Sequence, residues 1–223
     1  MEPISVRGFS LTGNQLKIIA MIAMTCDHIG LQLLPQWGFL RIIGRLALPI
    51  YAYMIAEGCR YTRDGKKYLL RMAGLGALCQ LVYFFAMGSL YMCILVTFSL
   101  SICLIRVWDS PKIRKSAFPV TLAVFFLCVV IPDLFPGFEI DYGISGVLLP
   151  VLIYFGKPKH LYLAVGCLLL ALSHGGIQWW GFAAIPLLML YNGKKGTYNI
   201  GKLFYWYYPV HLVVIYLLSL ILI

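Results

Sequence analysis

Long apolar runs separated by short polar turns make up almost the whole chain. The first four runs and the last are long enough to cross about 30 Å of hydrocarbon as helices. The four between them are shorter, so each is either a short buried span or part of a re-entrant hairpin. This pattern predicts an all-α, polytopic integral membrane helix bundle with about nine transmembrane helices. The runs cover residues 16–34, 39–58, 68–87, 90–107, 117–132, 143–156, 160–174, 177–191 and 203–223.

Composition supports a membrane protein and narrows its class. The chain is 61% hydrophobic and 12% charged, and no polar stretch is long enough for a separate soluble domain, so we expect residues 1–223 to form a single transmembrane domain. The first run ends without a small-residue cleavage site, so we expect it to be retained. The seven cysteines form no Cys-x-x-Cys pair, and their number is odd. They therefore suggest neither a disulfide framework nor a zinc site, and we expect no metal.

The net charge of +10 belongs to short loops rather than to a basic soluble face. With nine spans and a cytoplasmic amino terminus, the outward-facing turns at 35–38, 88–89, 133–142 and 175–176 contain no Lys or Arg. All of the 18 Lys and Arg residues except Arg41 and Arg45 then fall on the cytoplasmic side. This asymmetry is typical of membrane topology, so we expect a lipid bilayer as partner and no nucleic acid.

Charged residues inside the apolar runs are the main candidates for a functional site. Lys17 and His28 are eleven positions apart, which puts them on nearly the same helix face, roughly 16 Å from each other. Asp27 precedes His28, and Arg41 and Arg45 share one face of the second helix at a similar depth. The side chains of Asp27, His28, Arg41 and Arg45 can therefore converge in the outer half of the membrane, where ionisable residues are costly. Two interpretations stay open: a structural Asp27–Arg45 ion pair, or a working site.

Other polar residues extend this candidate site. His211 lies near the bilayer centre in the last run, within the sequence Tyr205-Trp-Tyr-Tyr-Pro209-Val-His211. Most of the aromatic residues there fit an interfacial belt. We include Tyr208 and Tyr51 as candidate substrate-binding residues. Glu57, at the inner end of the second run, is either a charge partner for the basic loop that follows it or a further substrate-binding residue.

Several motifs together resemble the TraX family over almost the whole chain. They include the segment from Leu16 to Gly30 that contains Asp27-His28, and Leu40-Arg-Ile-Ile-Gly-Arg45-Leu-Ala-Leu-Pro49. Others are Asp141-Tyr-Gly-Ile-Ser-Gly, Tyr191-Asn-Gly-Lys-Lys-Gly196 and Phe204-Tyr-Trp-Tyr-Tyr-Pro209-Val-His211. The founding member of the family is associated with conjugation and with amino-terminal acetylation of pilin. The family is also similar to the acyltransferase-3 group, whose first helix carries a basic residue, ten intervening residues and a histidine, the spacing of Lys17 and His28.

This resemblance implies an acyltransferase, with acetyl-CoA or another acyl-CoA as the donor on the cytoplasmic side. His28 is then the candidate general base, because the pKa of an unperturbed imidazole suits proton transfer near neutral pH. Asp27 either sets the tautomer of His28 or pairs with an arginine, and an arginine or Tyr51 stabilises the oxyanion. The candidate catalytic residues are His28, Asp27, Arg45, Arg41 and His211.

Coenzyme A brings phosphates, which would bind a basic inner vestibule, although the same charges can serve topology alone. The candidate cofactor-binding residues are Lys17, Arg60, Arg63, Lys66, Lys67, Arg71 and Lys202. The expected location is the bacterial cytoplasmic (inner) membrane, and the acceptor is a pilin-like peptide, a glycan or a small molecule. A homodimer is left open. A small-molecule or proton-coupled transporter is the alternative, weakened because the sequence shows no inverted repeat and no Gly/Pro-broken helix pair in matching positions of two halves. A passive scaffold would leave the buried charges unexplained.

Overall fold

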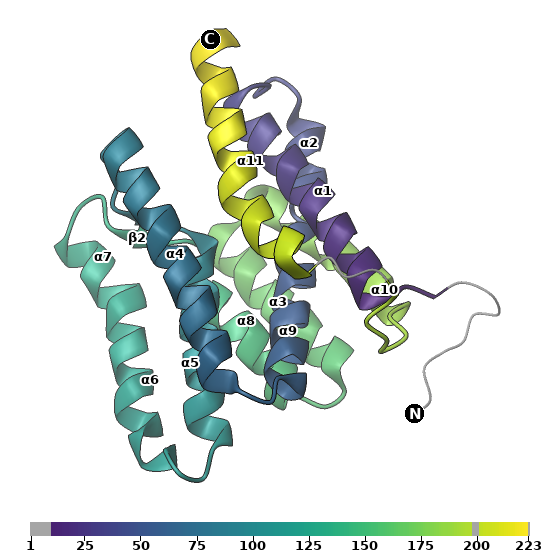
Figure 1. Ribbon diagram of the computed structural model, residues 1–223, viewed down its shortest axis with the longest axis vertical. Coiled ribbons are helices and arrows are strands. Elements are labelled where there is room, and N and C mark those ends of the chain that lie inside the picture. Colours follow the sequence, from purple (N-terminus) through teal and green to yellow (C-terminus); the bar gives the residue numbers. More distant parts are fainter. Residues whose placement is uncertain (1–9, 198–200, 223) are drawn as a thin grey trace. The chain divides into compact units, whose positions relative to one another are not determined.

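The computed structural model describes residues 10–197 and 201–222, and nearly all of them are helical (Figure 1). Every apolar run of the sequence contains helix, so the all-α prediction is confirmed apart from one sheet of two short strands. The elements are α1 Gly13–Gln32, α2 Gly38–Gly44, α3 Ala47–Tyr61, α4 Gly65–Met87, β1 Tyr91–Met92, α5 Ile94–Asp109, η1 Arg114–Ser116, α6 Ala117–Phe125, η2 Phe126–Val130, α7 Ile131–Leu134, β2 Glu139–Ile140, α8 Gly143–Phe155, α9 Lys159–His174, η3 Gly176–Ala183, α10 Ala184–Met189 and α11 Gly201–Leu222.

The chain divides into two compact units. The first unit combines Met1–Met54 with Leu163–Ile223, and the second consists of Ile55–Tyr162. The boundaries fall inside α3 and α9. The first unit is therefore built from both ends of the chain, and the prediction of a single domain stays a prediction.

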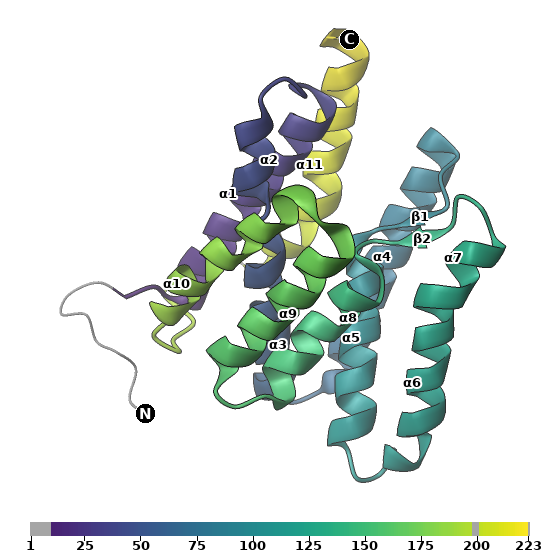
Figure 2. The ribbon, with the colours of Figure 1, turned by 180° about the vertical axis from the view of Figure 1, so that it is seen from behind.

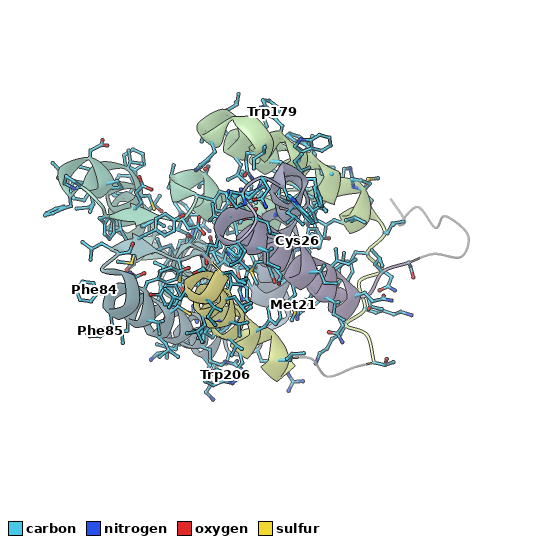
Figure 3. The ribbon with its side chains drawn as sticks, turned by 90° about the horizontal axis from the view of Figure 1, so that it is seen from above. Met21, Cys26, Phe84, Phe85, Trp179 and Trp206 are labelled. Carbon is cyan, nitrogen blue, oxygen red and sulfur yellow. The ribbon has the colours of Figure 1, made fainter. Side chains whose placement is uncertain are left out.

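Three stretches of the described residues are long and apolar enough to cross a membrane: Gly38–Tyr61, Gly65–Phe85 and Arg114–Leu134. Several shorter apolar helices accompany them, among them α8 and α9. Large apolar side chains are exposed along these elements, and Figure 3 shows Phe85, Trp179 and Trp206 projecting outward. Such surfaces are expected of helices that face lipid. The number of spans and their orientation remain predictions.

In the first unit, glycines let α1 and α2 pack closely. A Cβ added to Gly30 would lie 2.9 Å from the Cβ of Leu40, and one added to Gly44 would overlap the side chain of Asp27. Small residues at helix interfaces are the usual means by which membrane helices approach one another. Both ribbon views also place α11 beside α1 (Figure 1, Figure 2). These two contacts bring α2 and α11 to the same helix.

The loop 191–196 closes the start of α1. Thr12 caps this helix in a capping box with Gln15. The backbone N–H groups of Gly13 and Asn14 donate to the carbonyls of Lys194 and Lys195, at 2.8 and 3.0 Å. Helix N-terminal amides lack partners within their own helix, so this loop satisfies two of them.

The second predicted helix is broken, which the sequence analysis did not anticipate. Helix α2 ends at Gly44, Arg45 and Leu46 form a turn, and α3 begins at Ala47. Pro49 explains the break, because it has no N–H to bond the carbonyl four residues earlier and its ring crowds that carbonyl. A proline fits within the first turn of a helix, where Pro49 now lies. The break places Arg45 at a helix end.

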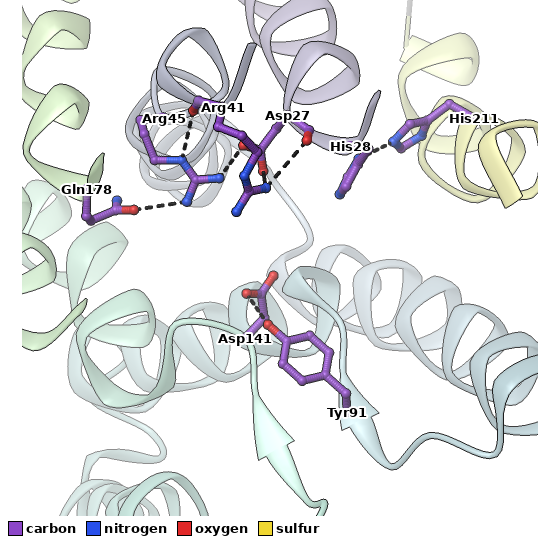
Figure 4. A network of polar contacts seen from close by, with 8 residues as sticks. All are labelled: Asp27, His28, Arg41, Arg45, Tyr91, Asp141, Gln178 and His211. Carbon is purple, nitrogen blue, oxygen red and sulfur yellow. Dashed lines mark hydrogen bonds and ion pairs between the residues drawn. The ribbon is translucent and has the colours of Figure 1, made fainter. Parts of the chain in front are cut away.

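In the second unit, the short sheet joins the segment before α5 to the segment before α8. Strands β1 and β2 are parallel, with Tyr91 opposite Glu139. Asp141 follows β2 and is held by three bonds: its carboxylate accepts from the Tyr91 hydroxyl at 2.6 Å, its carbonyl accepts from the Thr97 hydroxyl, and its N–H donates to Met92 (Figure 4). Asp141, the first residue of the motif Asp141-Tyr-Gly-Ile-Ser-Gly, thus holds the segment between β2 and α8 in place.

A π-helical segment, η2, joins α6 to α7. Pro132 cannot donate to the carbonyl of Cys128, so the regular pattern is interrupted, and the N–H of Ile131 bonds the carbonyl of Phe126, five residues earlier. Buried Val124 and Cys128 pack there with Leu104 and Val147. The helical path of Arg114–Leu134 therefore continues past its proline.

Candidate functional site

Four polar side chains from three elements of the first unit form an ion cluster. Asp27 of α1 accepts from Arg41 of α2 through Oδ2, at 2.9 Å from Nη1, and its Oδ1 pairs with Nη2 of Arg45 (Figure 4). Gln178 of η3 accepts from Nη1 of Arg45 at 3.1 Å. The carboxylate therefore meets two guanidinium groups, and the cluster carries a net positive charge.

The helix break positions Arg45. At the end of α2, its Nε donates to the carbonyl of Arg41 at 3.3 Å, so the side chain covers a carbonyl near the point where α2 ends. Its side chain is only 7% exposed, and its bonds run to α1, α2 and η3. A buried arginine needs such partners on all sides of its planar fork. Arg45 is thus held rigidly within the unit.

Arg41 is the more available of the two arginines. Its side chain is 25% exposed, and its contacts with Asp27, one to the carboxylate and one to the backbone carbonyl, both run through Nη1. The rest of its guanidinium is not committed to that carboxylate. Among the charged groups of the cluster, Arg41 is the better placed to meet a second anionic group.

A pair of histidines lies beside the ion cluster. Nδ1 of His28 is 2.9 Å from Nε2 of His211, and the ring centroids are 5.0 Å apart (Figure 4). His211 is buried, and its Nδ1 lies 2.8 Å from the carbonyl oxygen of Tyr207. The structure thus joins His28 of α1 to His211 of α11, although 183 positions separate them.

Aromatic residues of α11 hold the second histidine. The ring of Tyr207 stacks on that of His211, with centroids 5.0 Å apart and 8° between the planes, and Tyr208 meets it edge-on. The hydroxyl of Tyr207 is also hydrogen-bonded to Thr25 of α1. Tyr51 of α3 is buried and lies in the neighbourhood of Tyr207. Two predicted binding residues, Tyr51 and Tyr208, therefore lie near the histidine pair.

The geometry decides between the two roles left open for Asp27. Its carboxylate pairs with Arg41 and Arg45, while the ring nitrogen of His28 bonds His211. Asp27 therefore serves as the counter-ion of the arginines, and His211 is the group that contacts His28. Neighbouring positions on a helix point about 100° apart, which is why adjacency in sequence did not become contact.

Glu57 and Arg60 make structural contacts in the second unit. Glu57 is buried and pairs with Lys159 of α9, 2.6 Å away, rather than with the basic loop that follows α3. Arg60 donates to the carbonyl of Tyr154 at 2.6 Å, near the end of α8, and lies over the ring of that tyrosine. These contacts join the end of α3 to α8 and α9.

The candidate cofactor-binding residues are divided between the units. Lys17, half-buried in α1, lies in the first unit, near Lys195. Arg60 and the exposed Arg63, Lys66, Lys67 and Arg71 lie in the second. Lys202 belongs to α11, but its side chain is outside those that the structure describes. Each unit therefore carries its own basic group, and a common vestibule stays a prediction.

The sequence analysis did not predict three residues of this site: Gln178, Tyr207 and Thr25. Gln178 is a polar residue within an apolar run, which is a signal in itself. Tyr207 is four residues from His211, and Thr25 is three residues from His28, so helical spacing could have indicated both.

Within the described residues, no group of three or more His, Cys, Asp or Glu side chains could hold a metal ion.

Comparison with known proteins identifies the family of this chain. The TraX protein family model matches residues 12–219, which include α1, the ion cluster and α11 as far as residue 219. The chain belongs to the TraX family. It is 29% identical to the probable fimbrial assembly protein FimC, serogroup H1, of Dichelobacter nodosus, over 94% of this chain and 96% of that protein. A segment of 38 residues is 55% identical to an uncharacterized protein of Rickettsia prowazekii (strain Madrid E), covering 17% of this chain and 15% of that one. No solved structure matches.

Proposed function

We propose that this TraX-family protein is a membrane acyltransferase that moves an acyl group, such as acetyl, from a cytoplasmic acyl-CoA to an amine or hydroxyl acceptor. The observation that carries the proposal is the histidine pair beside an ion cluster, inside a protein otherwise built from apolar helices. Ionisable groups within membrane segments are costly and mark functional sites. A histidine with one nitrogen engaged is suited to proton transfer.

The proposed reaction is direct transfer. The acceptor nitrogen or oxygen attacks the thioester carbonyl while His28 takes its proton. A new C–N or C–O bond forms, the C–S bond breaks, and the thiolate of coenzyme A leaves with the proton that His28 returns. The base and the stabiliser of the oxyanion are the two groups that such a reaction requires.

Arg41 is the proposed stabiliser of the oxyanion. It is partly exposed, and its contacts with Asp27 use one terminal nitrogen. Arg45, whose bonds extend in three directions, would instead hold Asp27 and Arg41 in place. The hydroxyl of Tyr51 is the neutral alternative for the same role.

Basic residues toward the cytoplasm would receive the phosphates of the donor. With the amino terminus inside, Lys17, Lys194 and Lys195 lie at the inner end of α1, and the exposed Arg63, Lys66 and Lys67 lie in the first inner loop. Charge-assisted bonds to phosphate are stronger than neutral ones, so both groups are candidates. This arrangement fits a protein that crosses the cytoplasmic membrane of a bacterium several times.

The relative's name bears on the acceptor. A relative that matches this chain over 96% of its own length is named as a probable fimbrial assembly protein. Among a peptide, a glycan and a small molecule, this favours a protein or peptide of the cell surface as the acceptor.

Labelled acetyl-CoA tests the proposal. Purified protein in detergent or liposomes is incubated with [¹⁴C]acetyl-CoA and a membrane extract, and labelled products are separated and identified. We expect labelled product with wild type and labelling at least about 10²-fold slower with His28→Ala. A wild-type protein that neither binds acetyl-CoA nor labels any product would reject the proposal.

A transporter is the second candidate, and the broken helix favours it. Discontinuous helices often form binding sites in transporters, and the α2–α3 break lies at the ion cluster. Flux of a solute or of protons through proteoliposomes, without transfer of label, would support this alternative. Label transfer without flux would support the acyltransferase.

A further inference from the structure

The bond between His211 and Tyr207 has only one possible direction. A backbone carbonyl oxygen accepts and cannot donate, so the 2.8 Å contact requires a proton on Nδ1 of His211. In a neutral imidazole the other nitrogen is then an unprotonated acceptor. Nε2 of neutral His211 therefore offers a lone pair, and it faces His28.

The same reasoning continues to His28. Nε2 of His211 lies 2.9 Å from Nδ1 of His28, so Nδ1 of His28 must be the donor. We infer that His211 fixes the tautomer of His28, leaving Nε2 of His28 unprotonated and available as the base. Figure 4 shows the second ring nitrogen of His28 pointing away from His211. His211 is thus a positioning residue, and its importance for catalysis rests on the proposed function.

Tyr207 keeps this chain of bonds in line. The hydroxyl of Thr25 donates to the carbonyl of Met21 at 2.9 Å, so it accepts from the hydroxyl of Tyr207. The ring of Tyr207 covers one face of His211, and its carbonyl bonds the edge. Tyr207 therefore contacts His211 twice, through ring stacking and through the bond to Nδ1, and its own hydroxyl is bonded to Thr25 of α1. These contacts limit rotation of the His211 ring.

The arrangement accepts one proton. A proton taken by Nε2 of His28 leaves the Nδ1–H donated as before, and transfer along the 2.9 Å bond would place the charge on His211 without breaking the bond to Tyr207. Two protonated rings would turn two N–H groups toward each other. Arg41 and Arg45 also act on His28 electrostatically, with Asp27 between them as the counter-ion, and the added charge would meet two cations. The pair is therefore expected to hold a single extra proton.

Nitrogen NMR tests the tautomer without any need for activity. Protein labelled with ¹⁵N-histidine has four histidines, and His28→Asn and His211→Gln identify the signals of the pair. In wild type we expect neutral His28 to carry its proton on Nδ1. Neutral His28 protonated on Nε2 in the wild-type protein would overturn the inference.

Two substitutions of His211 separate positioning from packing. The amide oxygen of His211→Gln can accept the bond from Nδ1 of His28, whereas His211→Phe keeps an aromatic ring but has no acceptor. We expect the Gln variant to retain the His28 tautomer and the Phe variant to lose it. If both variants unfold, as judged by gel filtration and thermal melting, the wild-type spectrum assigned with His28→Asn still decides the question.

Transfer kinetics give the second readout. We expect His211→Phe to lower kcat for labelled acetyl transfer at least tenfold with little change in the KM for acetyl-CoA, and His211→Gln to recover most of that loss. Equal losses in both variants, with an unchanged His28 tautomer, would contradict the positioning role. A wild type that transfers no label would count against the proposed function, while its NMR spectrum would still test the tautomer.

Discussion

Asp27 and Glu57 are both acidic side chains withdrawn from the surface, one in each unit, yet their surroundings differ. The Asp27 side chain is 14% exposed and meets two arginines, one of which is also bonded to Gln178. The Glu57 side chain is 9% exposed and meets Lys159, whose side chain is 30% exposed. The first pairing is held from several directions, whereas the second joins two helix ends through a flexible lysine.

This difference shows that a buried ion pair does not by itself identify a functional site. Both acids satisfy the sequence rule that intramembrane charges deserve a functional hypothesis. Only Asp27 lies beside a titratable ring whose hydrogen bond is fixed by a second ring. The histidine pair, rather than the ion pair, distinguishes the first unit from the second.

The largest expected effect is on transfer activity. We expect His28→Ala to lower the rate of labelled acetyl transfer by at least about 10²-fold, as for loss of a general base. Glu57→Gln is the control in the second unit, because it keeps the shape of a buried acidic side chain. We expect its rate to stay within about threefold of wild type, since the contacts of Glu57 are structural. Initial rates at saturating acetyl-CoA measure both. A larger loss in Glu57→Gln than in His28→Ala would reverse the assignment of the site.

The next effect concerns stability. Asp27→Ala leaves two arginines without their counter-ion, one of them buried, and should cost about 3–5 kcal/mol. Glu57→Ala should cost less, about 1–2 kcal/mol, because Lys159 is partly exposed and can turn toward water. Unfolding in detergent mixtures, followed by circular dichroism, compares the two. Similar losses would mean that the two pairings are energetically equivalent.

A smaller effect is expected where α1 and α2 pack. A Cβ on Gly44 would overlap Asp27, so Gly44→Ala should destabilise the protein by about 1–3 kcal/mol through overpacking. Gly38→Ala in the same helix is the matched control, because nothing lies within 4 Å of its added Cβ. The same unfolding measurement applies, and a Gly44→Ala protein as stable as the control would show that the ion cluster tolerates displacement.

The smallest effect belongs to an exposed acid of the second unit. The carboxylate of Asp64 accepts from the N–H of Lys67 at the start of α4, which lowers the pKa of Asp64 below its ordinary value of 3.8. A lowered folded-state pKa stabilises the cap above the unfolded pKa, and this contribution is lost as the pH falls through the folded pKa. The Lys67 amide NMR signal should therefore shift below pH 3.8 in wild type but not in Asp64→Asn. Identical pH profiles would exclude Asp64 as the titrating cap.

The sequence predicted much of the helical structure and part of the site. The sequence placed Asp27, Arg41 and Arg45 at similar depths in the membrane, because a helix has a fixed rise per residue, and so predicted that they could meet. Depth does not specify which helices are neighbours, so the contact between His28 and His211 could not be derived. The break at Arg45 could have been inferred from Pro49, but the contact with Gln178 depends on how η3 packs against α2.

The construction of the first unit from both chain ends has a consequence for biogenesis. Asp27 finds its two counter-ions within 18 residues, so the α1–α2 hairpin can enter the bilayer with its carboxylate already neutralised during translation. The partner of His28 is synthesised 183 residues later, a delay of roughly 10–35 s at typical elongation rates. A nascent chain stalled before α11 would therefore contain the inserted ion cluster but an unpaired His28, and the proton-accepting centre would be completed only with the last helix.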